Sequence, residues 1–280
     1  MVVAGYVDTS SAVDGNFLIK CLESCTQFLK TYCLTMALRQ RLYLVLLCIT
    51  VIGSLFKELL PLPDSYLNNK RNFLNVYFVK VAWAWTFWLL LPFIAITTFY
   101  LTRNQKEVLR RLSTLLIGTI IWYVCTRFFM FIENLTGSCY TSEALQDLKE
   151  EHENKKACVM GGGVWYGFDI SGHSFLLPYC ILMIVEETAV VHELKLQKNQ
   201  YIHIIVSALF VALGILALIW VWMFFCTAIY FHDIYQKLFG TAFGLLAWYG
   251  TYQAWYLHPI SPGRPPQGSY LKSKQHSYRL

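Results

Sequence analysis

Two histidines are the residues whose type and position best suit chemistry. His173 follows the sequence Asp169-Ile-Ser-Gly at the start of an apolar run, and His232 stands between two apolar runs. An ionisable group at the boundary of a membrane segment is a functional candidate. The five other histidines fall in loops, at the ends of apolar runs or in the tail, where a solvated polar residue is the ordinary interpretation: His152, His192, His203, His258 and His276.

A pair of histidines suits phosphoryl transfer without a metal ion. One imidazole attacks phosphorus, and the other protonates the leaving oxygen and then activates water. Ser171 can hydrogen-bond a phosphate oxygen, Gly172 lets a backbone N–H approach it, and the start of a helix favours an anion. The chain has no CxxC pair, no G-x-S-x-G sequence and no nucleotide-binding P-loop, so we expect no metal site and no cofactor.

The composition is that of an integral membrane protein. Of the 280 residues, 56% are hydrophobic, 16% aromatic and only 14% charged, and the mean hydropathy is +0.44. Soluble domains carry about 25% charged residues. The numbers therefore predict an all-α membrane protein and argue against a disordered chain, a coiled coil or a nucleic-acid-binding domain.

Six apolar runs predict six transmembrane helices, which divide the chain into three parts. Residues 1–38 form an N-terminal segment, in which polar side chains recur at helical spacing from Phe17 to Leu38 and predict an amphipathic helix on the membrane surface. Residues 39–258 form the membrane domain, and residues 259–280, rich in proline, an extended tail. The predicted spans cover residues 42–60, 81–102, 112–132, 165–185, 204–231 and 238–257.

The distribution of lysine and arginine predicts the orientation. Fourteen of the 23 basic residues fall on the side of the two termini, so we expect both termini in the cytosol. This orientation places His173 and His232 together at the lumenal face. It also leaves open a disulfide between Cys139 and Cys158, which share the longest polar stretch between spans.

The surrounding sequence is similar to two related families. Ser-Gly-His at the mouth of a span, with a second histidine further along, resembles the lipid phosphate phosphatase superfamily. Longer stretches resemble the fat storage-inducing transmembrane protein family: KELLPLP from Lys57, NKRNFLNVYFVKVAWAWTFW from Asn69, GFDISGHSFLL from Gly167, MIVEE from Met183 and YFHDIYQKLFGTAFGLLAWYGTYQAWY from Tyr230.

The resemblance implies an endoplasmic-reticulum protein with six spans, a lipid phosphate phosphatase-like core and both termini in the cytosol. It implies a fatty acyl-CoA diphosphatase that releases acyl 4′-phosphopantetheine and adenosine 3′,5′-bisphosphate. It further implies binding of diacylglycerol and triacylglycerol among the membrane lipids, and a role in lipid droplet formation. The catalytic histidines of the family fall on His173, as the acid, and His232, as the nucleophile.

The chain departs from the superfamily pattern where a phosphate clamp is expected. Cys226 stands six residues before His232 in place of an arginine, and Gln236 stands four residues after it in place of an aspartate. Asp233 could orient His232 instead. Cations that could replace the clamp are Lys80 and Arg127, with Lys70 and Arg71 as further candidates.

Two other functions remain open at this point. A non-catalytic scaffold that binds diacylglycerol and triacylglycerol and partitions them into droplets fits the long aromatic spans. A transporter fits less well, because the sequence has no evident duplicated half and no pair of charges in the middle of a span.

Overall fold

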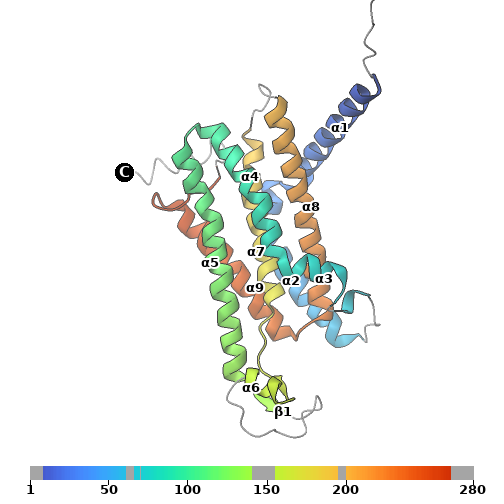
Figure 1. Ribbon diagram of the computed structural model, residues 1–280, viewed down its shortest axis with the longest axis vertical. Coiled ribbons are helices and arrows are strands. Elements are labelled where there is room, and N and C mark those ends of the chain that lie inside the picture. The colour runs from blue at the N-terminus through green and yellow to red at the C-terminus, as the bar shows by residue number, and fades with distance from the viewer. Residues whose placement is uncertain (1–8, 61–65, 70, 141–154, 195–199, 266–280) are drawn as a thin grey trace, which may run out of the picture.

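The computed structural model describes residues 9–60, 66–69, 71–140, 155–194 and 200–265. The chain folds into a bundle of long helices with a small unit below one end (Figure 1). In chain order the long helices are α1 (Thr9–Phe28), α2 (Met36–Leu59), α4 (Ala82–Thr102), α5 (Gln105–Thr136), α7 (Gly172–Thr188), α8 (Gln200–Tyr230) and α9 (Ile234–Trp248).

Short elements connect them. The turns η2 (Tyr66–Asn68), α3 (Phe73–Tyr77) and η3 (Val79–Val81) lead into α4, and η4 (Ala189–His192) extends α7. The small unit contains β1 (Ser138–Tyr140), α6 (Lys155–Met160) and β2 (Val164–Tyr166). After α9 the helix widens into η6 (Tyr249–Ala254), a π-helix, and ends in η7 (Trp255–Leu257).

The fold is that of an all-α integral membrane protein. By length and composition, five of the described helices can cross a membrane: α2, α4 with η3, α5, α7 with η4, and α8. Helix α9 has 15 residues, fewer than the roughly 20 that a span needs. Its helical path continues through η6 and η7 to Leu257, so a sixth crossing at 238–257 stays a prediction.

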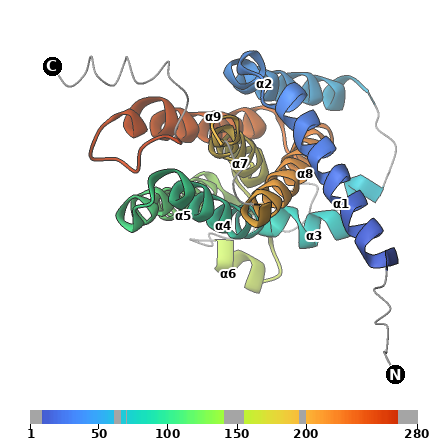
Figure 2. The ribbon, with the colours of Figure 1, turned by 90° about the horizontal axis from the view of Figure 1, so that it is seen from above.

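Helix α7 lies in the middle of the bundle, with α2, α4, α5, α8 and α9 around it (Figure 2). Almost all of its side chains are buried, whereas the other spans leave many apolar side chains exposed. Those exposed faces are the surfaces that lipid tails cover in a bilayer. Inside the bundle, polar side chains hydrogen-bond one another across helices. Trp220 Nε1 donates to Thr86 Oγ1 (3.1 Å), and the hydroxyl groups of Thr50 and Thr241 lie 3.0 Å apart.

Several predicted boundaries differ from the structure. The spans predicted from residues 42 and 112 correspond to helices that begin earlier, at Met36 in α2 and at Gln105 in α5. The predicted span at 165–185 was expected to begin at Trp165, but α7 begins at Gly172. The apolar residues before it form β2, which pairs antiparallel with β1 (Trp165 opposite Cys139). The predicted amphipathic helix over 17–38 is divided between two helices. Helix α1 ends at Phe28 and is followed by the π-helix η1 (Leu29–Cys33), and α2 starts at Met36 with Thr35 as its N-cap.

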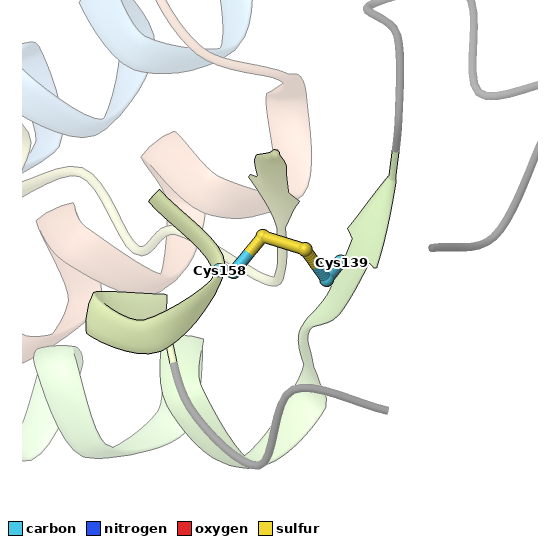
Figure 3. Close-up of a disulfide and its surroundings, with 2 residues drawn as sticks. All are labelled: Cys139 and Cys158. Atoms are coloured by element: carbon cyan, nitrogen blue, oxygen red, sulfur yellow. A yellow bond between two sulfur atoms is a disulfide. The ribbon is translucent and has the colours of Figure 1, made fainter. Parts of the chain in front are cut away.

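A disulfide joins Cys139 and Cys158 in the small unit, with 5.7 Å between their Cα atoms (Figure 3). Further contacts join β2 and the residues after it to the end of α5: Trp165 Nε1 donates to the carbonyl of Glu133 (3.2 Å), and Phe168 N–H donates to Thr136 Oγ1 (2.9 Å). The small unit therefore fixes the path of the chain directly before the Ser-Gly-His sequence.

Candidate functional site: the start of α7 and the α8–α9 turn

His173 lies in the first turn of α7. Ser171 is the N-cap: its backbone is extended, and its hydroxyl oxygen accepts the N–H of Ser174 (3.3 Å). Ser171 is fully buried, so the hydroxyl that the sequence offers to a phosphate serves here to start the helix. The first N–H groups of a helix have no partner inside it, and at Gly172 a Cβ would meet no atom within 4 Å. There is open space beside this backbone, which suits the approach of an anion.

His232 lies in the turn between α8, which ends at Tyr230, and α9, which begins at Ile234. Its φ angle is +52°, in the left-handed region that costs a residue with a side chain about 1–2 kcal/mol. The imidazole is largely buried, with 19% of the side chain exposed. The surrounding structure thus holds this histidine in a conformation that it would not adopt by itself.

Helix α9 brings the two histidine segments together, and both lie at the lower end of the bundle (Figure 1). The N–H of Ser171 donates to the carbonyl of Gln236 (3.2 Å). A Cβ at Gly240 would lie 2.5 Å from the Ser171 carbonyl oxygen, and one at Gly244 would lie 2.5 Å from that of Phe175. These two glycines, four residues apart, let α7 and α9 approach closely. This packing places the segment before His173 beside the first turn of α9, four residues after His232.

Gln236 determines which nitrogen of His232 carries the proton. Its Oε1 accepts the backbone N–H of Asp233 (3.2 Å) and lies 3.2 Å from His232 Nδ1. Because the backbone N–H can only donate, the atom facing it is the amide oxygen, and that oxygen can only accept. His232 Nδ1 must therefore donate. In the neutral ring, the lone pair that a nucleophile uses then lies on Nε2.

Asp169 is a second partner of the same ring. Its Oδ2 lies 3.7 Å from His232 Nδ1, and it comes from the segment that the small unit fastens to α5. A carboxylate on the Nδ1 side stabilises the protonated imidazole. Gln236 and Asp169 are thus the two described side chains that face Nδ1 of His232.

The sequence missed the cations beside the turn. Lys57, at the end of α2, places Nζ 2.6 Å from the carbonyl oxygen of His232 and 3.7 Å from Asp233 Oδ1. Asp233 is mostly exposed and pairs with Lys57 rather than with the imidazole. Lys237 is fully buried and donates to the carbonyl of Ala228 (2.7 Å). Two weak signals were present in the sequence. Lys57 opens the KELLPLP stretch that carries part of the family resemblance, and Gln236 stands one helical turn after His232.

The cations that the sequence proposed have other surroundings. Arg127 lies on the exposed face of α5, with its guanidinium 5.5 Å from the centre of the Tyr123 ring and Nε 3.3 Å from that tyrosine's hydroxyl. Lys80 is exposed in η3, and in the described part of the chain it makes no ion pair. Lys70 lies outside the described residues. Neither Lys80 nor Arg127 has a described contact with the two histidine segments.

No group of three or more His, Cys, Asp or Glu side chains within the described residues is arranged to hold a metal ion. The described cavities also lie away from the histidines. An apolar cavity of about 660 Å³ opens between α4, α5 and α8 with Arg103 at its rim. A second of about 410 Å³ lies between α2 and α8 with Arg41 at its rim.

The chain is similar to known proteins over most of its length. The family model for fat storage-inducing transmembrane protein matches residues 63–252. Acyl-coenzyme A diphosphatase FITM2 of Bos taurus is 60% identical, and that of Homo sapiens 58%, each covering 92% of this chain and 98% of the relative. Fat storage-inducing transmembrane protein 1 of Homo sapiens is 34% identical over 92% of this chain and 85% of its own length.

No solved structure matches the chain. The family model covers more than half of the sequence and includes both histidines, together with Asp169, Gln236 and Lys237. The relatives named above extend the similarity over α2 and Lys57. The chain therefore belongs to the fat storage-inducing transmembrane protein family.

Proposed function

We propose that the protein hydrolyses the phosphoanhydride of fatty acyl-CoA to acyl 4′-phosphopantetheine and adenosine 3′,5′-bisphosphate. The observation that carries the proposal is the arrangement around His232, whose Nδ1 is bonded to Gln236 beside the open N-terminal turn of α7. The names of the relatives, acyl-coenzyme A diphosphatase, support the same reaction. In this proposal, hydrolysis of acyl-CoA supports lipid metabolism in the endoplasmic reticulum and the formation of lipid droplets.

The reaction needs two steps. His232 Nε2 attacks one phosphorus of the anhydride, an N–P bond forms, and the bond from that phosphorus to the bridging oxygen breaks. His173 gives its proton to the departing phosphate. Water then attacks the phosphorus, the now neutral His173 takes the proton of the water, and the N–P bond breaks to release the second product. The backbone N–H groups near Gly172 offer hydrogen bonds to the phosphate oxygens. No metal ion takes part.

Trapping the covalent intermediate tests this proposal. The purified protein is mixed with fatty acyl-CoA in the presence of EDTA and quenched in alkali, because N–P bonds are labile in acid. We expect a peptide whose His232 carries one half of the substrate, seen by mass spectrometry, and none in the His232→Ala protein. Turnover that EDTA abolishes and one divalent ion restores would contradict the metal-independent route.

We also propose that the protein lies in the endoplasmic-reticulum membrane with both termini in the cytosol. The distribution of basic residues supports this orientation. The Cys139–Cys158 disulfide supports it independently, because disulfides form and persist in the oxidising lumen. The histidine segments lie at the same end of the bundle as this disulfide (Figure 1) and are thus lumenal.

Glycosylation mapping tests the orientation. An acceptor sequence inserted near Asp147 should gain a glycan, because the 133–169 segment faces the lumenal transferase. An acceptor placed in the 103–105 turn or after Leu280 should stay unmodified. A glycan on the tail would reverse the orientation and move the histidines to the cytosolic face.

A second candidate function is the binding of diacylglycerol and triacylglycerol without catalysis. The two apolar cavities between helices favour it, since their linings suit acyl chains. They lie away from the histidines. Lipid binding and hydrolysis can therefore be separated by substitution: the His232→Ala protein should lose hydrolysis and keep lipid binding.

A further inference from the structure

Two lysines hold the turn that carries His232. Lys57 reaches the carbonyl oxygen of His232 from α2, and Lys237 reaches the carbonyl oxygen of Ala228 from α9, at 2.6 and 2.7 Å. The last carbonyl groups of a helix lack partners inside it, and α8 ends at Tyr230. Phe231 N–H donates to the carbonyl of Thr227 (3.2 Å), and Lys237 donates to the carbonyl of Ala228, the next residue. Lys57 is therefore the cation that acts on His232 itself.

The contact of Lys57 with the backbone is closer than its ion pair. Nζ lies 2.6 Å from the His232 carbonyl oxygen but 3.7 Å from Asp233 Oδ1, and 78% of the Asp233 side chain is exposed. An exposed pair of this kind contributes little, whereas a charged donor on a carbonyl makes one of the stronger hydrogen bonds. The ammonium thus acts mainly on the main chain at position 232.

We infer that Lys57 is a positioning residue for His232, an inference that rests on the proposed function. The left-handed backbone at 232 directs the imidazole toward Gln236 and Asp169. Lys57 compensates for the cost of that backbone by holding its carbonyl. Without the ammonium, the backbone relaxes toward negative φ, the bond from Nδ1 to Gln236 loosens, and Nε2 no longer points reliably at phosphorus.

Substitution of Lys57 separates positioning from substrate binding. Lys57→Met keeps the length of the side chain and removes the donor, and we expect kcat to fall roughly tenfold, the equivalent of the left-handed penalty. KM for acyl-CoA should stay within about twofold, because a positioning residue does not contact substrate. Lys57→Arg keeps a charged donor and should recover most of kcat. The matched control is Lys156→Met, which removes an exposed lysine on the small unit.

A second measurement does not depend on turnover. Diethyl pyrocarbonate modifies the unprotonated nitrogen of histidine, and mass spectrometry follows its rate at His232. We expect Lys57→Met to raise this rate several-fold as the ring leaves its fixed position, and Lys57→Arg and Lys156→Met to leave it unchanged. If Lys57→Met does not yield folded protein, Lys57→Gln is measured in its place by the same criteria.

Two results would overturn the inference. An increase in KM at unchanged kcat would assign Lys57 to the substrate phosphate instead. An unchanged modification rate at His232 would mean that the ammonium does not hold the turn. The proposed role of His232 as nucleophile fails separately, if the His232→Ala protein keeps wild-type hydrolysis. In that case the modification rate in the Lys57 variants still reports whether Lys57 positions the ring.

Discussion

Replacing His232 with alanine is expected to lower kcat for acyl-CoA hydrolysis by more than about 10³-fold, because the substitution removes the nucleophile itself. The contact with Gln236 engages Nδ1, so Nε2 is the nitrogen of this ring that attacks phosphorus. The rate should be measured on purified protein by the release of adenosine 3′,5′-bisphosphate.

The same assay should show a smaller loss for His173→Ala, about 10²-fold. The leaving group is a phosphate, whose conjugate acid is strong, so it needs less help from a proton donor than an alkoxide would. In the wild-type protein the rate should follow a bell-shaped pH profile, because His232 must be neutral and His173 protonated. The His173→Ala profile should lose the limb that falls at high pH.

His192→Ala is the matched control. His192 is exposed and lies in η4 at the opposite end of α7, so its loss should change neither kcat nor KM. Binding of diacylglycerol and triacylglycerol should persist in both catalytic variants, because the apolar cavities lie elsewhere. Wild-type hydrolysis by the His232→Ala protein would mean that His232 is not the nucleophile.

The spans could be predicted because a membrane imposes long uncharged runs. The predicted 81–102 and 204–231 lie within a few residues of α4 and α8. The start of α7 could not be predicted in the same way, because Trp165 and Tyr166 of β2 are apolar and were included in the predicted span 165–185. They form a strand through pairing with β1, about 26 positions earlier in the sequence.

The sequence could single out the two candidate histidines but not the side chains that contact His232. Ser-Gly-His and the second histidine are local patterns that topology brings to one face. Lys57 contacts a residue 175 positions away, and no local pattern announces such a contact. In the sequence, Gln236 is only a departure from the superfamily pattern. The structure shows that its Oε1 faces both the Asp233 N–H and His232 Nδ1, and this contact orients the imidazole of His232.

A network of buried charges at the other end of α7 could not be predicted from the sequence either. Glu186 pairs with Arg39 of α2 at 2.9 Å, and Glu187 pairs with Arg111 of α5 at 2.5 Å. Tyr252 donates its hydroxyl proton to Glu187 Oε1 (2.7 Å). In the sequence alone, each of these charged residues stands at the edge of an apolar run, where a charge at the membrane interface is the ordinary interpretation. The network joins helices that lie far apart in the sequence.

Glu187→Ala is expected to lower the free energy of unfolding by about 3–5 kcal/mol, because it leaves Arg111 buried without its carboxylate. Only 6% of the Arg111 side chain and 2% of the Glu187 side chain are exposed, so water cannot replace the lost partner. For a chain of this size the melting temperature should fall by roughly 10 °C. Fluorescence-detected size-exclusion chromatography after heating measures the change in detergent.

A double variant and a surface control separate the buried charge from the loss of contacts. Arg111→Met with Glu187→Leu removes both charges and should recover most of the stability, since an apolar pair of similar volume avoids the uncompensated ion. Glu107→Ala breaks the pair with Arg110 on the same helix, where 40% of each side chain is exposed, and should change the melting temperature by no more than about 2–4 °C. A Glu187→Ala protein as stable as the Glu107→Ala protein would mean that the network does not hold α7.

The same variants should leave the chemistry of each folded molecule nearly unchanged. Glu187 lies 14 residues beyond His173 on α7, about 21 Å along the helix. Hydrolysis per mole of folded Glu187→Ala protein, assayed well below its melting temperature, should therefore stay close to wild type while its heat stability falls. The contrast with His232→Ala, which should keep its stability and lose its turnover, places catalysis and helix anchoring at opposite ends of α7.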